Sequence, residues 1–137
     1  MIDAPSAPAR PATILVVDEE VMVRFAIADY LRDCGYRVME AASAKEAMLV
    51  MGTRDVPVDI VLCDAALKGE VNGFALAQSL RTQRPGIPVI LAASPAKAVD
   101  AAAELCDKGP QLSRPYEPQL VVDRIKRLLA KQDNTRR

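Results

Sequence analysis

The sequence predicts an α/β fold in which a parallel sheet is covered by helices on both faces. Short apolar, β-branched runs alternate with segments of helical length, and this alternation repeats five times within 137 residues. Strands that are buried on both faces typically show such continuous apolar runs. Alternating strands and helices favour parallel pairing with right-handed crossovers. We therefore expect five strands and five helices in one doubly wound sheet.

The first half of the chain supplies three predicted strands and two predicted helices. Gly35 is a typical helix stop, and Ser43 followed by Glu46 three residues later is a capping-box pattern. The strands are expected at Thr13–Val17, Tyr36–Glu40 and Asp59–Cys63, and the helices at Val21–Cys34 and Ala44–Met51.

The second half continues the alternation after a loop over residues 65–72. Pro118 can open the last helix, which carries an apolar stripe. For five such units the natural strand order is 2-1-3-4-5, which is the flavodoxin-like (βα)5 arrangement. The remaining elements are helices at Gly73–Arg84 and Ala96–Leu105, strands at Pro88–Ala93 and Gln111–Ser113, and tails at 1–11 and 132–137 that we expect to be disordered or flexible.

Composition excludes several classes of protein. The net charge is zero, so no basic surplus points to nucleic-acid binding. The chain has no histidine, which rules out a Ser-His-Asp triad, an imidazole base and a histidine phosphodonor. No apolar run reaches the 18 residues of a membrane span, and no signal peptide is visible. We expect a single domain without a membrane anchor.

The three cysteines, Cys34, Cys63 and Cys106, are far apart in the sequence. They form no CxxC pair, so a zinc site is not expected. Isolated cysteines are typical of core packing in a reducing compartment. We therefore interpret all three as packing residues and expect a cytoplasmic protein.

Carboxylates follow the first and third predicted strands. In an open α/β sheet, ligands bind at the carboxyl ends of strands where the strand order reverses, here between strands 1 and 3. Asp18-Glu19 and Asp64 stand at those two ends. Clustered carboxylates repel one another unless a cation such as Mg²⁺ neutralises them, and a carboxylate can accept a phosphoryl group. The alternative is that these acids are solvated loop residues or helix caps.

The segments that carry this pattern resemble the receiver domains of response regulators, over about residues 12–131. The resemblance implies that Asp64 is the phosphoacceptor, that Glu19 binds Mg²⁺ directly, and that Asp18 binds it directly or through water. It also implies that the backbone carbonyl of Ala66 is a metal ligand. The matching segments are ILVVDEE (14–20), IVLCDAALKGEVNGFALAQSLR (60–81), IPVILAAS (87–94) and LSRPYEPQLV (112–121).

Three positions depart from that family's pattern. Ala93 stands where the family has a Thr or Ser that binds the phosphoryl group, and Ser94 replaces it only if the strand end shifts by one residue. Arg114 stands where the family has Lys, so it either binds phosphate or only neutralises the acidic pocket. Gln111 occupies the position of the aromatic switch residue. The accepting part of the site therefore looks intact and the switching part altered.

Taken together, the residues and the resemblance predict a phosphoacceptor rather than a turnover enzyme. The expected partners are a histidine kinase or a histidine phosphotransfer protein and an unidentified downstream protein, with a homodimer possible and no nucleic acid. One alternative is a degenerate receiver that binds proteins whatever its phosphorylation state. Another is an enzyme on the same fold, but Ala66 replaces the second carboxylate of a phosphohydrolase, and no GxxxxGK[ST] or GxGxxG motif is present.

Overall fold

The computed structural model describes residues 11–53 and 57–107, together with Asp123 and Arg127, which are helical. The predicted fifth strand, with Gln111 and Arg114, lies outside the described residues, as do residues 1–10 and 132–137. None of the helices within the described ranges is long and apolar enough to cross a bilayer.

Four parallel strands form the sheet, in the order β2-β1-β3-β4. This confirms the predicted order for the strands that the structure describes. Adjacent strands end level with one another, because Val17 pairs with both Ala41 and Cys63, and Asp64 pairs with Ala92. The strands are β1 (Thr13–Val17), β2 (Arg37–Ala41), β3 (Ile60–Asp64) and β4 (Val89–Ala92), each within two residues of its predicted bounds.

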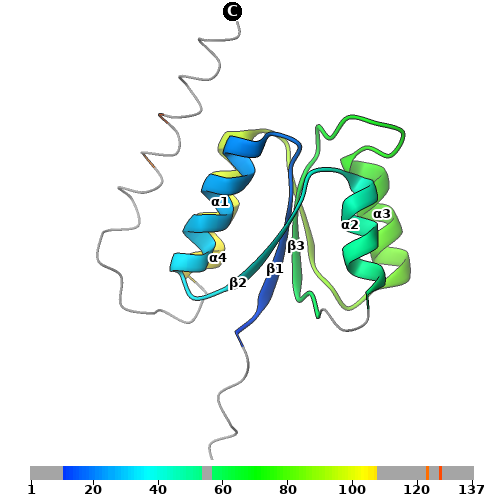
Figure 1. Cartoon of the computed structure of the whole chain (residues 1–137), viewed down its shortest axis with the longest axis horizontal. Helices are drawn as coiled ribbons and strands as arrows, with labels where there is room; N and C mark the ends of the chain where they lie inside the picture. The colour runs from blue at the N-terminus through cyan, green and yellow to red at the C-terminus, as the bar shows by residue number, and fades with distance from the viewer. Residues whose placement is uncertain (1–10, 54–56, 108–122, 124–126, 128–137) are drawn as a thin grey trace, which may run out of the picture.

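Helices cover both faces of this sheet (Figure 1). The helices α1 (Val21–Asp33) and α4 (Pro95–Asp107) pack together on one face, and α2 (Ala44–Gly52) and α3 (Gly73–Gln83) lie on the other. The crossover through α1 runs toward one sheet edge, and those through α2 and α3 run toward the opposite edge. Crossovers of one hand that run in opposite directions must lie on opposite faces, as these do.

The central strand β1 divides the core in two. All five of its residues are buried, and successive side chains point to opposite faces. Ile14 and Val16 pack in the cluster under α1 and α4, whereas Leu15 and Val17 pack in the cluster under α2 and α3. This confirms the prediction from the apolar run that Thr13–Val17 is a strand buried on both faces.

Local signals set the ends of α1 and α2 as the sequence predicts. Gly35 has a φ of 99°, a left-handed conformation that terminates α1 at little cost. At the start of α2, the backbone N–H of Glu46 donates to Ser43 Oγ over 3.1 Å. The Glu46 carboxylate in turn accepts from the backbone N–H of Ala42 over 2.7 Å, so the side chain reaches back past the cap residue.

A disulfide joins Cys34 to Cys106, and it was not expected from the sequence. The interpretation of all three cysteines as unpaired packing residues is wrong for this pair, although both are fully buried. Cys63 is buried and free, as expected. The pairing depends on α4 lying against α1, where Tyr36 Oη also donates to the carbonyl of Leu105. The predicted strand order with right-handed crossovers would place α4 on the face of α2 and α3, so its position beside α1 was not expected.

Candidate functional site: two aspartates at the ends of adjacent strands

Asp18 follows the last residue of β1 and is buried, with 4% of its surface exposed. Its backbone N–H donates to the carbonyl of Ala41, the last residue of β2, over 3.0 Å. Its Oδ1 accepts from the backbone N–H of Glu20 over 2.9 Å. Glu20 is the residue that precedes α1, and its own side chain makes no capping bond. Asp18 therefore fixes the turn that leads into α1 but is not the N-cap residue of this helix, and its second carboxylate oxygen stays outside that bond.

Asp64 is the last residue of β3 and is only partly buried. Its Oδ1 accepts from the backbone N–H of Ala66 over 2.9 Å. The next residue, Ala65, donates its N–H to the carbonyl of Ala92 at the end of β4, over 2.9 Å. The backbone below the aspartate is thus held by the neighbouring strand, while its side chain reaches the surface beside an exposed loop.

The start of α3 lies directly against this turn, and Gly73 makes the approach possible. A Cβ at Gly73 would stand 2.8 Å from the Cα of Ala65, closer than real side chains come. The preceding residue, Asn72, caps α3 by accepting from the N–H of Ala75 over 2.9 Å. The sequence pattern predicted Gly73 as a helix boundary but not this close approach, although the Asn72-Gly73 pair before a helix was a visible signal.

The charges at this edge of the sheet act on one another. Burial raises the pKa of Asp18 to about 7, and the charge of Asp64 adds to that rise. The nearby Arg24 opposes it, and Glu19 contributes a further small rise. Burial likewise raises the pKa of the Cys63 thiol to about 12, with Asp64 and Asp18 adding to it. Asp18 and Asp64 are therefore close enough to repel, and Cys63 is an unreactive thiol, as its interpretation as a packing residue requires.

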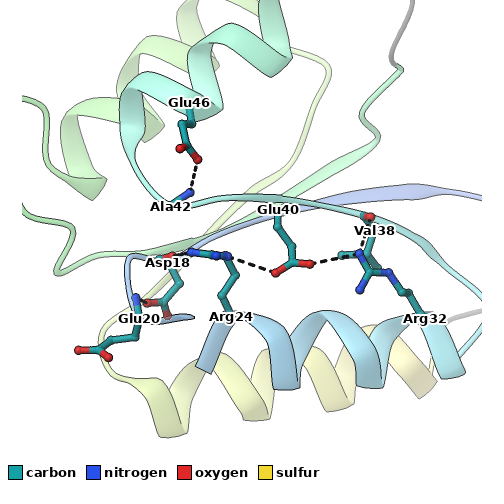
Figure 2. A network of polar contacts seen from close by, with 8 residues as sticks. All are labelled: Asp18, Glu20, Arg24, Arg32, Val38, Glu40, Ala42 and Glu46. Carbon is teal, nitrogen blue, oxygen red and sulfur yellow. Dashed lines mark hydrogen bonds and ion pairs between the residues drawn. The ribbon is translucent and has the colours of Figure 1, made fainter. Parts of the chain in front are cut away.

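An arginine-glutamate network lies behind Asp18 (Figure 2). Arg24 on α1 donates from Nη1 to the backbone carbonyl of Asp18 over 2.9 Å, and from Nε to Oε1 of Glu40 over 3.1 Å. Arg32, further along the same helix, donates to Oε2 of Glu40 over 3.3 Å and to the carbonyl of Val38 over 3.1 Å. This network was not predictable from the sequence, because its arginines lie on α1 and Glu40 lies on β2.

The other predicted site residues within the described ranges are Glu19, Ala66, Ala93 and Ser94. Glu19 is partly buried beside Asp18, and Ala66 lies exposed after Asp64. Ala93 is exposed directly after β4, so the strand end does not shift toward Ser94. The Ser94 hydroxyl accepts from the N–H of Lys97 over 3.2 Å at the start of α4.

The donor chemistry at this site fits Mg²⁺. In the part of the chain that the structure describes, no three acidic or cysteine side chains gather closely enough to form a complete ligand set. Mg²⁺ does not need one, because it keeps several waters and is typically held by one or two carboxylates. Burial is the main cause of the raised pKa of Asp18, and the charge of Asp64 adds a repulsion that Arg24 opposes. A hard cation between Asp18 and Asp64 would relieve this repulsion.

Curated relatives match most of this chain but little of their own length. The "Sensor kinase CckA" of Brucella abortus is 34% identical over 123 residues, which is 89% of this chain and 13% of that protein. The "Probable transcriptional regulatory protein TcrX" of Mycobacterium tuberculosis is 29% identical over 124 residues, 90% of this chain and 52% of that protein. The chain thus spans 13% and 52% of the length of these two relatives, and their similarity to it concerns one domain.

Solved structures of response regulators also resemble this chain. The receiver domain of NtrX from Brucella abortus has a TM-score of 0.55 at 27% identity, covering 85% of this chain and 98% of that one. The response regulator TrrA from Thermotoga maritima, solved in complex with Mg²⁺-BeF, has a TM-score of 0.54 at 28% identity, covering 58% and 67%. The family model for the response regulator receiver domain matches residues 14–126. The chain therefore belongs to the response regulator receiver domain family.

Proposed function

We propose that this receiver accepts a phosphoryl group on Asp64, with Mg²⁺ held at Asp18, Glu19 and Asp64 and at the backbone carbonyl of Ala66, in part through bridging waters. The observation that carries the proposal is the contrast at the ends of β1 and β3. Asp18 is buried and its pKa is raised, whereas Asp64 is partly exposed and its Oδ2 bonds to no residue within the described ranges. One aspartate is suited to hold a cation and the other to meet a substrate.

In this proposal a carboxylate oxygen of Asp64 attacks phosphorus, and the bond between phosphorus and the leaving group breaks, with its electron pair going to that group. Bound Mg²⁺ supplies neutralisation of the charge on the phosphoryl oxygens. The Ala66 N–H orients the attacking side chain through its bond to Oδ1. Arg114 is the candidate for binding the phosphoryl group, because β4 ends at Ala92 and the Ser94 hydroxyl caps α4. The protein is then consumed as an acceptor and does not turn over as an enzyme.

The proposed phosphodonor is a protein, since apolar side chains are exposed around the site. Three of these side chains lie at the start of α1, which follows Asp18, and a fourth lies in the first turn of α3. Each is about three-fifths exposed, and they are Val21, Met22, Phe25 and Phe74. Exposed apolar groups of this kind mark protein contacts. Family membership points to a histidine kinase or a histidine phosphotransfer protein. A Phe25→Ser variant should slow transfer from such a donor and leave transfer from a small molecule unchanged. Equal slowing with both would contradict the docking role.

The test uses the whole chain, a small acyl phosphate such as acetyl phosphate, and Mg²⁺. Intact-protein mass spectrometry should show one added phosphoryl group, and chelation of Mg²⁺ should prevent it. An Asp64→Asn variant should show none, and Asp29→Asn, which changes an exposed acid on α1, should behave as the native chain. An adduct that persists in Asp64→Asn would overturn the assignment of the acceptor.

A degenerate receiver is the second candidate function, and Ala93 is the observation that favours it. This exposed residue after β4 offers no hydroxyl to a phosphoryl group, and the neighbouring Ser94 caps α4. Conformational signalling requires contacts that differ between the two states. An adduct on Asp64 that leaves the backbone amide chemical shifts of α4 unchanged would favour this second function.

A further inference from the structure

We infer that Arg24 is a positioning residue: anchored by Glu40, it holds the turn after β1 in the conformation that presents Asp18 and Glu19 to a cation. The part of this inference that concerns cation binding rests on the proposed function. The part that concerns the turn rests on the contacts of Arg24 shown in Figure 2. It concerns residues behind the site, which touch neither the cation nor the phosphoryl group.

The contacts of Arg24 are divided between the site and the sheet. Nη1 donates to the carbonyl of Asp18, and Nε donates to Glu40 on β2. The backbone N–H of Arg24 also donates to the carbonyl of Glu20, in the first turn of α1. The Arg24 side chain therefore connects α1 with Asp18 in the turn and with Glu40 on the neighbouring strand β2.

A planar guanidinium is needed for this arrangement. Its donors point in fixed, different directions, so two acceptors on different elements are held at a set separation. A lysine ammonium keeps the charge but lacks that fork. The Arg24 side chain is 15% exposed and Glu40 is 25% exposed, so this pair is sheltered from solvent more than a surface ion pair is.

The chain supplies a matched control in Arg32. It lies on the same helix and donates to the other carboxylate oxygen of Glu40. It is 41% exposed, and within the described residues its other contact is with the carbonyl of Val38, away from the turn. Loss of Arg32 removes an ion pair with Glu40 without touching Asp18. A difference between equivalent changes at the two arginines therefore reports on the turn itself.

The first measurement is Mg²⁺ affinity by titration, followed by NMR. Residues that orient metal ligands typically alter metal affinity by about 10- to 100-fold when changed. We expect Arg24→Lys to raise the Mg²⁺ dissociation constant about tenfold, although the charge is kept. Arg32→Lys should leave it unchanged. Glu40→Ala should weaken binding in the same direction, and adding it to Arg24→Lys should cause little further loss, because the two residues act together.

The second measurement needs no metal. The amide of Glu20 donates to Asp18 Oδ1 within the turn, and the amide of Glu46 donates to Ser43 Oγ in a distant cap. Arg24→Lys should speed hydrogen exchange at Glu20 and not at Glu46. A general loss of stability would raise exchange at both amides and would be visible as such.

The outcomes separate this inference from the proposed function. A native chain that binds no Mg²⁺ would refute the metal site, while the exchange at Glu20 would still decide the role of Arg24. An Arg24→Lys variant with the native affinity for Mg²⁺ and the native rate of hydrogen exchange at Glu20 would overturn the inference. So would tighter Mg²⁺ binding in Arg24→Ala together with no effect of Arg24→Lys, because Arg24 would then act through its charge alone.

Discussion

The turn after β1 and the turn after β3 each present an aspartate at the same edge of the sheet, but the two turns are built differently. Asp18 is buried and is held by bonds to Glu20, to Ala41 and to Arg24. Asp64 is partly exposed, and within the described residues its side chain bonds to the adjacent Ala66 N–H. One carboxylate is therefore fixed at a cost in burial and charge repulsion, whereas the other keeps access to solvent and substrate.

The two turns also differ in what supports them. The helix after Asp18 is braced by the disulfide between Cys34 and Cys106 and by the ion pairs of Glu40. The helix after Asp64 relies on a close backbone approach at Gly73 and on apolar packing. Each of these supports can be removed separately.

The largest effect is expected from the disulfide. It closes a span of 72 residues, for which loop-closure entropy gives about 4 kcal/mol of stability. Adding a dithiol reductant should lower the free energy of unfolding by about that amount, as measured by urea denaturation. The double variant Cys34→Ala with Cys106→Ala should not respond to the reductant. Three titratable thiols in the unreduced, denatured chain would contradict the pairing.

The next effect concerns the charge on Asp18. Its folded-state pKa of about 7 lies above the ordinary value of 3.8, so the folded chain holds this proton more tightly than the unfolded chain does. The stability from that proton is full below the ordinary value and is lost as the pH rises through about 7. Each unit of pKa shift corresponds to about 1.4 kcal/mol, and relaxation of the site reduces the total.

We therefore expect Asp18→Asn to stabilise the protein at pH 8 without Mg²⁺ by about 3 kcal/mol, and to lose this advantage toward pH 4. Urea denaturation across this pH range measures the difference. Mg²⁺ should stabilise the native chain at pH 8 and not the variant. The exposed Asp29→Asn serves as the control. If Asp18→Asn raised the free energy of unfolding by the same amount at every pH, the pKa of Asp18 would not be raised in the folded chain.

A smaller effect is expected at the other turn. Gly73→Ala places a Cβ against the backbone of Asp64 and Ala65, and such overpacking costs about 2 kcal/mol. Phosphorylation should slow as well, since the backbone of the acceptor must shift. Gly52→Ala is the control, because a Cβ there meets open space in a helix. A Gly73→Ala variant with native stability and native phosphorylation rate would show that the close approach has no role.

The smallest effect concerns Ser94. Loss of a helix-capping hydroxyl costs about 1 kcal/mol, so Ser94→Ala should lower stability by that amount. If the hydroxyl acts only as a cap, the rate of phosphorylation by acetyl phosphate should not change. A marked fall in that rate would instead make Ser94 a ligand of the phosphoryl group, in place of the hydroxyl that Ala93 lacks.

Much of the fold was predictable because each signal was local. The apolar runs, Gly35 and the Ser43 cap all act within a few residues, and the switch-point rule then brought Asp18 and Asp64 to one edge. The support of the site was not predictable in the same way. The pairing of Arg24 with Glu40, and of Cys34 with Cys106, depends on how α1 packs against β2 and α4, and no sequence spacing encodes that.

The central claim is that Asp64 accepts the phosphoryl group and Asp18 does not. It is tested most directly by locating the phosphoryl group. The chain is treated with acetyl phosphate and Mg²⁺, and the aspartyl phosphate is reduced with borohydride, which converts the modified aspartate to homoserine. Peptide mass spectrometry then identifies the position. Our account predicts homoserine at position 64 and unmodified aspartate at position 18. Homoserine at position 18, or at neither position, would contradict it.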